Sequence, residues 1–254
     1  MWSEARHQRI RTLLQRKGQL TTEETMQELG VSRETVRRDF LALEALGLLQ
    51  RVHGGAVHLS DEPPLDKRST IHVAAKKAIA RAVAQALQPP VTVFMDAGST
   101  TTILARELAR LGGITLITNS LSAAQCLVDS VRGGENQVIV LTGTLNGELF
   151  STTGAATVLQ LRRFHADVAL LSPVAFNARE GAASFLRDEA SIARAMCEGA
   201  RQTWILADHS KLGTSSRETY CAARDVDRLF CDRKAQSVEG FEALKASVGE
   251  VVLA

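Results

Sequence analysis

Three arginines between Ser32 and Phe40 have the spacing of side chains that contact DNA. Val36 and Phe40 lie four residues apart, as core-facing positions of a helix do. Arg33 and Arg37 then fall one turn apart on the exposed face. A guanidinium can donate two hydrogen bonds to a guanine edge or to phosphate oxygens, and a helix N-terminus adds backbone donors. The segment therefore predicts a helix that presents its first turns to the major groove.

The predicted DNA-binding residues come from this helix and from a glycine-tipped hairpin that follows it. They are Ser32, Arg33, Thr35, Arg37, Arg38, Arg51, His53 and Gly54. We expect bases to be contacted by Arg33, Thr35 and Arg37, and phosphates by Arg38, Arg51 and His53. Asp39 would repel phosphate, so we expect it to face inward and bind a neighbouring arginine or a backbone amide. The alternative is a solvated helix whose arginines only face water.

A second group of residues is suited to binding a phosphate group. The strand Val91–Met95 runs into Asp96–Thr102, which opens a helix. Gly98 allows close approach of the backbone, while the hydroxyls after it and the unpaired amides of a helix N-terminus favour an anion. The segment lacks the Gly-Lys-Ser/Thr ending of a P-loop and the glycine pattern of a dinucleotide-binding turn. It therefore predicts an anion site of another kind.

Polar residues also follow three later strands, at the same edge of the predicted sheet. They lie in Leu116–Ser120, Leu141–Thr144 and Ala207–Gly213. Open parallel sheets bind ligands at the carboxyl ends of their strands. Lys211 would supply a cation for a phosphate, and Asp96 an acceptor for sugar hydroxyls. The predicted effector-binding residues are Asp96, Gly98, Ser99, Thr100, Thr101, Thr118, Asn119, Gly143, Asp208, Ser210 and Lys211.

Capping residues and glycines divide residues 1–59 into short elements that can hold the arginines in place. We expect helices over 4–17, 22–29 and 33–46, a short extended piece at 19–20, and a hairpin over 48–59. Gly18, Gly30 and Gly47 would end the helices, and Thr21–Glu24 and Ser32 would cap the second and third. Gly54-Gly55 would form the hairpin turn. This order predicts a winged helix-turn-helix.

The pattern changes after residues 60–71, which are polar and contain adjacent prolines. This composition favours a linker over a surface loop within one domain. Beyond it, strands expected at 91–95, 114–118, 137–142, 167–171, 203–207 and 227–231 alternate with helices near 72–87, 100–111, 121–130, 154–163, 188–200 and 239–247. Such alternation predicts a mostly parallel sheet covered on both faces, an α/β, Rossmann-like fold. We expect a DNA-binding domain over 1–59, a linker over 60–71 and an effector-binding domain over 72–254.

Composition and charge exclude several classes of protein. Hydrophobic residues make up 45% of the 254 residues and charged residues 23%, as in globular chains. No apolar run approaches the ~20 residues that span a bilayer, and the N-terminus lacks the apolar region of a secretory signal. We therefore expect a cytoplasmic protein without a membrane partner. Residues 1–58 hold nine Lys and Arg against seven Asp and Glu, so the net charge of +2 lies there and permits a nucleic-acid partner.

The remaining reactive residues predict no further chemistry. The four cysteines are scattered without a Cys-x-x-Cys pair, so we expect reduced thiols. The scattered histidines predict no metal site, no serine has the surroundings of a hydrolase nucleophile, and we expect no cofactor. Trp204 is expected in the core. Lys76 and Lys77 are expected to form a solvated charge pair on a helix.

Residues 6–59 resemble the DNA-binding domain of the DeoR family of bacterial transcription regulators. The resemblance rests on Arg6, Ile10, Leu14, Ser32, Thr35–Phe40, Gly47, Leu48, Arg51 and His53–Ala56. It continues over 62–232 into that family's sensor domain, which is similar to sugar-phosphate isomerases, through Asp96, Gly98, Ser99–Thr101, Thr118–Asn119 and Asp208–Lys211. The resemblance implies a sugar-phosphate-isomerase-like fold for this domain. It also implies an effector that is a phosphorylated sugar, a polyol or a related intermediate. Binding of this effector would weaken the affinity of the protein for DNA.

One segment departs from the pattern of that family. Ser172–Asn177 stands where a Gly-Ala-Asp-Gly-like turn is usual, and Pro173 and Phe176 would make this wall of the pocket more apolar. An isomerase needs a carboxylate base within reach of its substrate, and the segment has none. We therefore expect a protein that is not an enzyme. The alternative is an isomerase-like enzyme with an appended DNA-binding domain.

These residues together predict a DNA-binding transcriptional regulator. We expect a repressor, with activation as the alternative. Its expected partners are double-stranded operator DNA and a phosphorylated sugar or polyol. We expect a homodimer or homotetramer, because repeated half-sites on DNA mirror the symmetry of the protein.

Overall fold

The computed structural model describes residues 2–17, 19–46, 48–52, 54–58 and 65–254. The chain forms two compact units, Met1–Pro63 and Pro64–Ala254.

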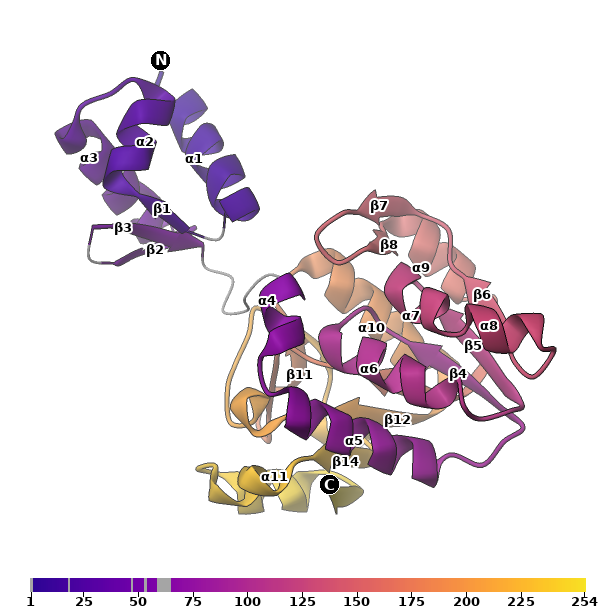
Figure 1. Ribbon diagram of the computed structural model, residues 1–254. Helices are drawn as coiled ribbons and strands as arrows, with labels where there is room; N and C mark the ends of the chain where they lie inside the picture. The colour runs from indigo at the N-terminus through magenta and orange to yellow at the C-terminus, as the bar shows by residue number, and fades with distance from the viewer. Residues whose placement is uncertain (1, 18, 47, 53, 59–64) are drawn as a thin grey trace. The chain divides into compact units, whose positions relative to one another are not determined.

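The first unit combines helices with a small antiparallel sheet (Figure 1). In chain order its elements are α1 (Ser3–Lys17), β1 (Gln19–Thr21), α2 (Thr22–Leu29), α3 (Arg33–Ala45), β2 (Leu49–Val52) and β3 (Gly55–His58). The sheet has the order β1-β3-β2. This arrangement confirms the predicted winged helix-turn-helix. Gly18 and Gly47, expected to end helices, and Leu59, expected in the hairpin, lie outside the described residues.

Short polar sequences fix the ends of α2 and the start of α3. The Glu24 amide donates a hydrogen bond to Thr21 Oγ1 at 3.1 Å, and the Thr21 amide donates one to the Glu24 carboxylate at 2.9 Å. Gly30 ends α2 with a φ of 63°, a left-handed conformation that glycine adopts at little cost. The Thr35 amide donates to Ser32 Oγ at 3.3 Å and caps α3. The direction of α3 is therefore set locally.

A hydrophobic core holds α3 against the rest of the first unit. Its buried residues include Ile10, Leu14, Val36, Phe40 and Leu43, which have the spacings expected of core-facing helix positions. The hairpin joins this core because Gly55 lets β3 approach β1. A Cβ at Gly55 would lie 2.2 Å from the Leu20 carbonyl oxygen, so a side chain there would separate the strands.

The second unit opens with a helix where an extended linker was expected. Helix α4 (Leu65–Thr70) is followed by Ile71, His72 and α5 (Val73–Ala86). An extended conformation is therefore the wrong prediction for residues 65–70, while the linker over 60–71 stays a prediction. Local bonds such as that from Thr70 Oγ1 to the Lys67 carbonyl, 2.8 Å long, stabilise a turn that composition alone does not reveal. Residues 59–64 lie outside the described part of the chain.

A parallel sheet of seven strands forms the centre of the second unit. Its strands are β4 (Val91–Met95), β5 (Ile114–Thr118), β6 (Gln137–Val140), β9 (Ala166–Leu171), β12 (Ala200–Leu206), β14 (Arg228–Cys231) and β15 (Glu250–Leu253). Their order is β15-β14-β12-β9-β4-β5-β6. Strands β5 and β6 follow on one side of β4, whereas β9, β12, β14 and β15 follow on its other side. The strand order therefore reverses between β4 and β9. Sheets of this kind hold ligands beyond the strand ends at such a reversal. The predicted α/β fold class is confirmed.

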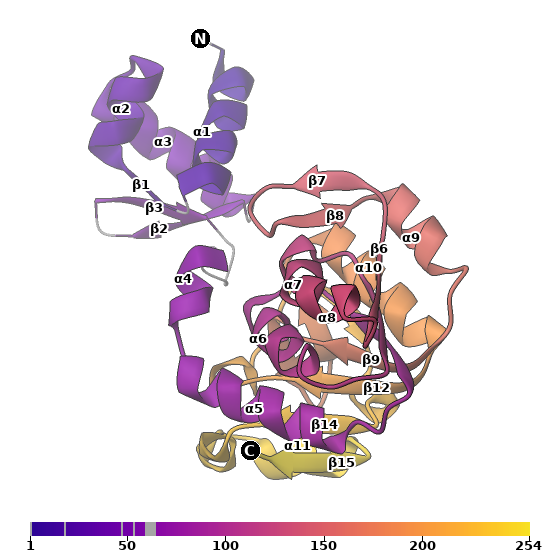
Figure 2. The same ribbon diagram turned by 45° about the vertical axis from the view of Figure 1, so that its right-hand side comes forward.

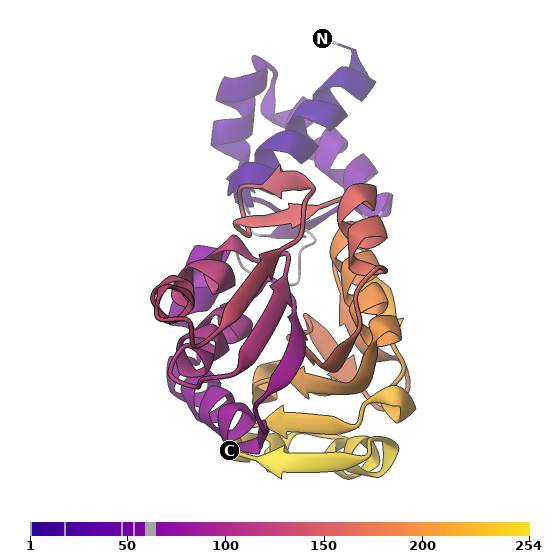
Figure 3. The ribbon, with the colours of Figure 1, turned by 90° about the vertical axis from the view of Figure 1, so that its right-hand side faces the viewer.

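Helices cover both faces of this sheet (Figure 3). One face carries α5, α6 (Ser99–Leu108), α7 (Leu121–Cys126) and α8 (Val128–Arg132), and the other carries α9 (Ala155–Leu161) and α10 (Arg187–Gly199). Alternate residues of a strand enter different cores. Val93 and Met95 of β4 lie in the core that includes α5 and α6, whereas Phe94 lies in the core that includes α10. Trp204 is buried in the core, as expected.

The second unit also contains short elements that were not predicted. Figure 2 shows the hairpin of β7 (Thr144–Asn146) and β8 (Ser151–Thr153). Strands β10 (Ala175–Asn177), β11 (Gly181–Ser184) and β13 (Glu218–Cys221) form a separate sheet, and η1 (His209–Lys211), η2 (Ala223–Asp225) and η3 (Arg233–Ser237) are 3₁₀ turns. The last helix is α11 (Phe241–Ser247). Elements of three to five residues are too short to show a period in the sequence.

Other features bear on the classes considered above. The four cysteines are free thiols. In the described ranges, no helix has both the length and the apolar character of a membrane span. The same ranges bring together no group of three or more potential metal ligands.

Candidate DNA-binding surface and effector site

The arginines of α3 face solvent. The side chains of Arg33, Arg37 and Arg38 are 69%, 66% and 78% exposed, whereas Val36 and Phe40 are buried. The spacing therefore separates an arginine face from a core face, and the guanidinium groups are accessible to a partner.

Each of these arginines has a glutamate neighbour on the surface. Arg33 pairs with Glu23. Arg37 Nε lies 3.6 Å from Glu34 Oε2, and Arg38 Nε lies 3.3 Å from Glu34 Oε1. Exposed ion pairs contribute only ~0–1 kcal/mol. A DNA phosphate or a base edge can therefore replace these carboxylates at small cost.

Ser32 and Thr35 form hydrogen bonds at the start of α3. Their hydroxyl oxygens lie 2.9 Å apart, and Ser32 also accepts the capping hydrogen bond. Ser32 is exposed, and Thr35 is half-buried. Both residues lie in the first turn of the predicted recognition helix, and their hydroxyls are already used within it.

Asp39 faces inward, as its position among the arginines suggested. Its carboxylate accepts hydrogen bonds from Arg6 Nε at 2.8 Å and Arg6 Nη2 at 2.9 Å, and it lies 3.0 Å from His7 Nε2. Burial by itself raises the pKa of Asp39, but the bonds and charge of Arg6 and His7 outweigh it and hold the pKa below its usual value. Asp39 therefore ties α3 to α1.

The hairpin between β2 and β3 contributes Arg51 and Gly54. Arg51 Nε donates to Glu44 Oε2 at 2.6 Å, and the Arg51 amide donates to Glu44 Oε1 at 2.9 Å. These bonds from Arg51 hold the pKa of Glu44 below its ordinary value. Gly54 is exposed at the tip, with a φ of 81°. Arg51 and His53 were predicted to contact phosphates from this hairpin. His53 lies outside the described residues, so the structure tests the position of Arg51 alone.

In the second unit, the residues that end β4 and β9 meet where the strand order reverses. The Ser172 amide, after β9, donates to Asp96 Oδ2, after β4, at 3.0 Å. A Cβ at Gly98 would lie 3.3 Å from Thr101 Oγ1 and 3.6 Å from Ser172 Cβ, so a larger residue would crowd this point. Asp96 thus also joins the two strand ends, in addition to its predicted role toward sugar hydroxyls.

The first turn of α6 is buried beside this junction. Ser99, Thr100 and Thr101 are all buried. Thr101 Oγ1 donates to the Asp96 carbonyl at 3.0 Å, so this hydroxyl stabilises the turn. The first amides of a helix have no partner within it, and they attract an anion together with the helix dipole. The predicted anion site therefore depends on these amides more than on the Thr101 hydroxyl.

Lys76 was expected on a solvated face and is instead buried. Its side chain is part of α5 and the residue is 4% exposed. Nζ donates to Ser99 Oγ at 3.0 Å and to the Arg68 carbonyl at 2.7 Å. The spacing holds the signal that sequence reasoning missed, because Lys76 lies three, four and seven residues before the buried Ile79, Ala80 and Val83. An ammonium group therefore stands at the start of α6.

Thr118 and Asn119 end β5 next to this site. Thr118 Oγ1 donates to the Met95 carbonyl at 2.7 Å and accepts from the Ser120 amide at 3.0 Å, which gives the hydroxyl a structural role. Asn119 Nδ2 donates to the Thr152 carbonyl at 2.9 Å. Asn119 Oδ1 is buried and has no hydrogen-bond donor among the described residues. Of the two, Asn119 keeps an acceptor for another group.

Gly143 is required by packing. A Cβ there would lie 2.1 Å from Thr157 Oγ1 and 2.6 Å from the Thr153 carbonyl oxygen, and its φ is 156°. The loop after β6 can approach β8 and α9 only because this residue has no side chain. The structure therefore explains this glycine without a ligand.

Two carboxylates hold the loop after β12, that of Asp208 within the loop and that of Asp232 after β14. Asp208 Oδ1 accepts from the Ser210 amide at 3.1 Å and from Ser210 Oγ at 2.6 Å. The His209 amide donates to Asp232 Oδ1 at 2.7 Å, and His209 Nδ1 lies 3.0 Å from Asp232 Oδ2. Lys211 is half-buried at the end of this loop. Asp208 and Ser210 thus shape the loop that carries Lys211.

The segment that departs from the family pattern forms part of a separate sheet. Phe176 of β10 is fully buried in the core, and its carbonyl accepts from the Gly213 amide at 2.9 Å. Pro173 is also buried. Phe176 is therefore a core residue. The expectation that it forms part of a wall of the pocket is wrong.

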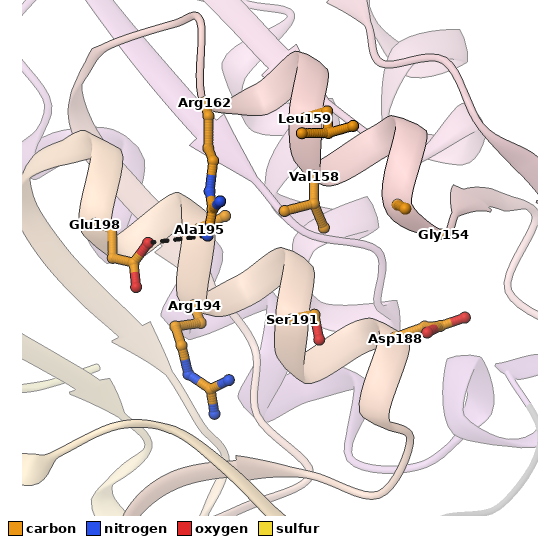
Figure 4. A pocket seen from close by; sticks show the side chains of 10 residues that line it. Gly154, Val158, Leu159, Arg162, Asp188, Ser191, Arg194, Ala195 and Glu198 are labelled. Carbon is orange, nitrogen blue, oxygen red and sulfur yellow. Dashed lines mark ion pairs between the residues drawn. The ribbon is translucent and has the colours of Figure 1, made fainter.

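A groove of about 440 Å³ lies between α9 and α10 (Figure 4). Its lining includes Val158 and Leu159 of α9, Arg162 directly after that helix, and Asp188, Arg194 and Glu198 of α10. Arg162 Nη2 lies 4.0 Å from Glu198 Oε2 across it. No predicted effector-binding residue lines this groove, so it is separate from the predicted effector site.

The two units match two family models. Residues 6–62 match the DeoR-like helix-turn-helix domain, and residues 71–233 match the DeoR C terminal sensor domain. The chain belongs to the DeoR family. The resemblance expected from the sequence is confirmed, and the protein is a DNA-binding transcriptional regulator.

Relatives of similar length are also transcription regulators. The HTH-type transcriptional regulator GolR of Listeria innocua is 31% identical over 233 residues, which cover 90% of this chain and 90% of the relative. The glycerol-3-phosphate regulon repressor of Haemophilus influenzae is 33% identical over 230 residues, which cover 89% and 88%. These relatives confirm the prediction that this DeoR-family protein is a regulator and not an enzyme.

A solved structure has a distant similarity to this chain. Ribose 5-phosphate isomerase A from Methanocaldococcus jannaschii has a TM-score of 0.38 and 15% sequence identity, over 54% of this chain and 53% of that one. The fold class is established by the strand order described above.

Proposed function

We propose that this DeoR-family protein is a repressor that binds operator DNA through its first unit and releases it when a phosphorylated sugar or polyol binds the second. The observation that carries the effector proposal is the buried ammonium of Lys76 beside the first turn of α6. A buried ammonium attracts an anion strongly, because little water screens its charge. A phosphate group beside Ser99 is a partner of the right charge at a helix N-terminus that favours anions.

The polar residues around this point suit the rest of such a ligand. Asn119 offers a buried acceptor, and Asp96 offers carboxylate oxygens at the end of the neighbouring strand. Both can accept hydrogen bonds from hydroxyl groups. The Haemophilus relative is named for glycerol 3-phosphate, a phosphorylated polyol, which supports this chemical class for the present chain. In the proposed site, Lys211 is a second cation.

For the DNA complex we propose that α3 enters the major groove. Arg33, Arg37 and Thr35 contact bases, while Arg38 and Arg51 contact phosphates after release from Glu34 and Glu44. Half-sites on operators repeat with the symmetry of the bound protein, so the proposed active form is a homodimer or homotetramer. With DNA as its target, the proposed place of action is the cytoplasm.

The DNA part of the proposal is tested by selection from random duplexes. The full chain is used to select duplexes from a random library, and the recovered operator is titrated with wild-type protein and with an Arg33→Ala/Arg37→Ala variant at one salt concentration. We expect one recurrent sequence, bound at least ~10-fold more weakly by the variant. Selection of no recurrent sequence, or equal binding by the variant, contradicts the proposal.

The effector part is tested by thermal shift against phosphorylated sugars and polyols, each with its unphosphorylated counterpart. A ligand that binds only the folded state raises the apparent stability, by ~2.7 kcal/mol at a hundred times its Kd. We expect stabilisation by a phosphate ester and not by its parent sugar. Lys76→Met and Thr100→Val/Lys211→Ala should each abolish the shift, with Lys77→Met as a control on the exposed face of α5. A shift that persists in both variants would place the site elsewhere.

A further inference from the structure

The segment Leu65–Lys76 joins the two proposed functions in the chain. It contains α4, then Ile71 and His72, and then the first turn of α5. Residues 59–64 connect it directly to the DNA-binding unit. We call Leu65–Lys76 the α4–α5 corner. Among the described residues of the second unit, the corner is therefore the part nearest along the chain to the DNA-binding unit.

The loop after β12 contacts this corner through a pair of histidine rings. The ring centroids of His72 and His209 lie 4.7 Å apart, with planes inclined by 64°. His209 stands between Asp208 and Ser210, and Asp232 fixes both its amide and its ring. The loop that carries Lys211 therefore has a defined contact with the corner.

The loop after β4 contacts the same corner through Lys76. Nζ bonds to Ser99 Oγ at 3.0 Å and to the Arg68 carbonyl of α4 at 2.7 Å, so one ammonium joins α4 to the start of α6. The Lys76 amide donates to the His72 carbonyl at 3.0 Å, which places both contacts on one helical turn. Two loops that are distant in sequence thus hold a single turn of the chain.

The backbone of His72 also marks this turn. His72 has a φ of 52° and a ψ of 32°, a left-handed conformation that is uncommon for residues other than glycine. Such conformations persist where the surroundings enforce them, and they are concentrated at functional and switch regions. His72 itself contacts the loop after β12, and Lys76, one turn later, contacts the loop after β4. The backbone geometry of the corner therefore depends on both loops.

We propose that the α4–α5 corner passes effector binding to the DNA-binding unit, with His72 as the positioning residue. This inference rests on the proposed effector site. An anion at the start of α6 attracts the Lys76 ammonium and weakens its bond to the Arg68 carbonyl, because a negatively charged acceptor attracts the ammonium more strongly than a neutral carbonyl does. A ligand that also engages the loop after β12 moves His209, and the ring contact carries that movement to His72. Both changes loosen α4.

The test uses inorganic phosphate as the probe, with chloride at equal ionic strength as the reference, on the full chain. His72→Asn removes the ring but keeps a residue that tolerates the left-handed backbone. His165→Asn makes the same change at an exposed histidine and is the matched control. Phosphate affinity is measured by titration calorimetry, and α4 by hydrogen exchange. Affinity for the selected operator is measured with and without phosphate.

In wild type and His165→Asn, we expect phosphate to speed exchange in α4 and to weaken operator binding. In His72→Asn, phosphate affinity should stay close to that of wild type, while the effect of phosphate on operator binding becomes roughly 2- to 30-fold smaller. If phosphate binds His72→Asn normally and weakens its operator binding as much as in wild type, the role of the corner is overturned and the proposed effector site is not. Absence of phosphate binding in wild type overturns the proposed effector site, and this inference with it.

Discussion

The candidate residues of the two units differ in how far the protein itself uses their hydrogen-bonding groups. Arg33, Arg37 and Arg38 stand in solvent beside exposed glutamates. In the second unit, the hydroxyls of Thr101 and Thr118 are buried and donate to backbone carbonyls. A surface that contacts a large partner can keep its side chains in water, whereas a site for a small ligand must hold its shape beforehand.

This difference shows for which kind of site the residue types in a sequence are informative. The proposed DNA-binding surface consists of side chains whose chemistry is evident in the sequence. The proposed effector site consists mainly of backbone amides and one buried ammonium, while the hydroxyls of Thr101 and Thr118 stabilise turns. Five predictions test or sharpen the contrast between an exposed and a preorganised site.

The largest effect is expected at Asp39, a charged residue of α3 that is buried. Asp39→Asn leaves Arg6 without its carboxylate. Breaking a buried pair costs ~3–5 kcal/mol, and we expect about 2–3 kcal/mol because Arg6 keeps some contact with solvent. The measurement is the free energy of opening of α1 and α3 amides, from hydrogen exchange on the full chain. A loss below ~0.5 kcal/mol would show that the pair does not stabilise the unit.

The same pair has a pH dependence with a definite sign. The folded-state pKa of Asp39 is lowered, so the unfolded chain binds more protons and stability rises with pH. The contribution is complete above the ordinary carboxyl pKa of about 4 and is lost as the pH falls through the folded-state value. The difference between wild type and Asp39→Asn should therefore shrink below about pH 4. A difference that grows on acidification contradicts the assignment.

Arg37→Ala tests the exposed face directly. Loss of one bidentate contact to a base is worth ~1–3 kcal/mol, so affinity for the selected operator should fall about 5- to 150-fold. Fluorescence anisotropy at fixed salt measures it. Arg11→Ala, an exposed arginine of α1, is the control and should have a much smaller effect. Equal losses in both variants would mean that charge alone determines binding.

Glu34→Gln tests whether the surface carboxylates compete with DNA. Glu34 lies beside both Arg37 and Arg38, and an exposed pair is worth ~0.2–1 kcal/mol, so removing its charge should tighten operator binding about 1.5- to 5-fold. Glu28→Gln, which removes the partner of Arg9, is the matched control. Weaker binding by Glu34→Gln would show that Glu34 contributes a contact of its own.

The smallest effect concerns the closed interior of the second unit. Burial, and then the nearby Asp232 carboxylate, raise the pKa of the Cys231 thiol to about 12, so it stays protonated at neutral pH. Iodoacetamide should leave Cys231 unmodified in the folded protein and modify it after unfolding in urea, as mass spectrometry can show. Rapid modification of the folded protein would mean that this core opens readily.

The winged helix and the parallel sheet could be predicted from the sequence because caps, glycines and apolar periods define them locally. Lys76 was missed because its charge was given more weight than its place on the buried face of α5. The packing of Gly143 against Thr157 could not be predicted, because it depends on contacts between distant segments. The hairpin β7–β8 and helix α4 are short and depend on hydrogen bonds that have no periodic signal.

The most direct test of the whole account is the affinity of the full chain for its selected operator, measured with and without the phosphate ester that stabilises it most. Coupling between two binding sites is typically 1–3 kcal/mol, so the ester should weaken operator binding about 5- to 150-fold. Its unphosphorylated parent should have no effect. Operator affinity that is unchanged by an ester that binds would contradict the claim that the second unit controls the first.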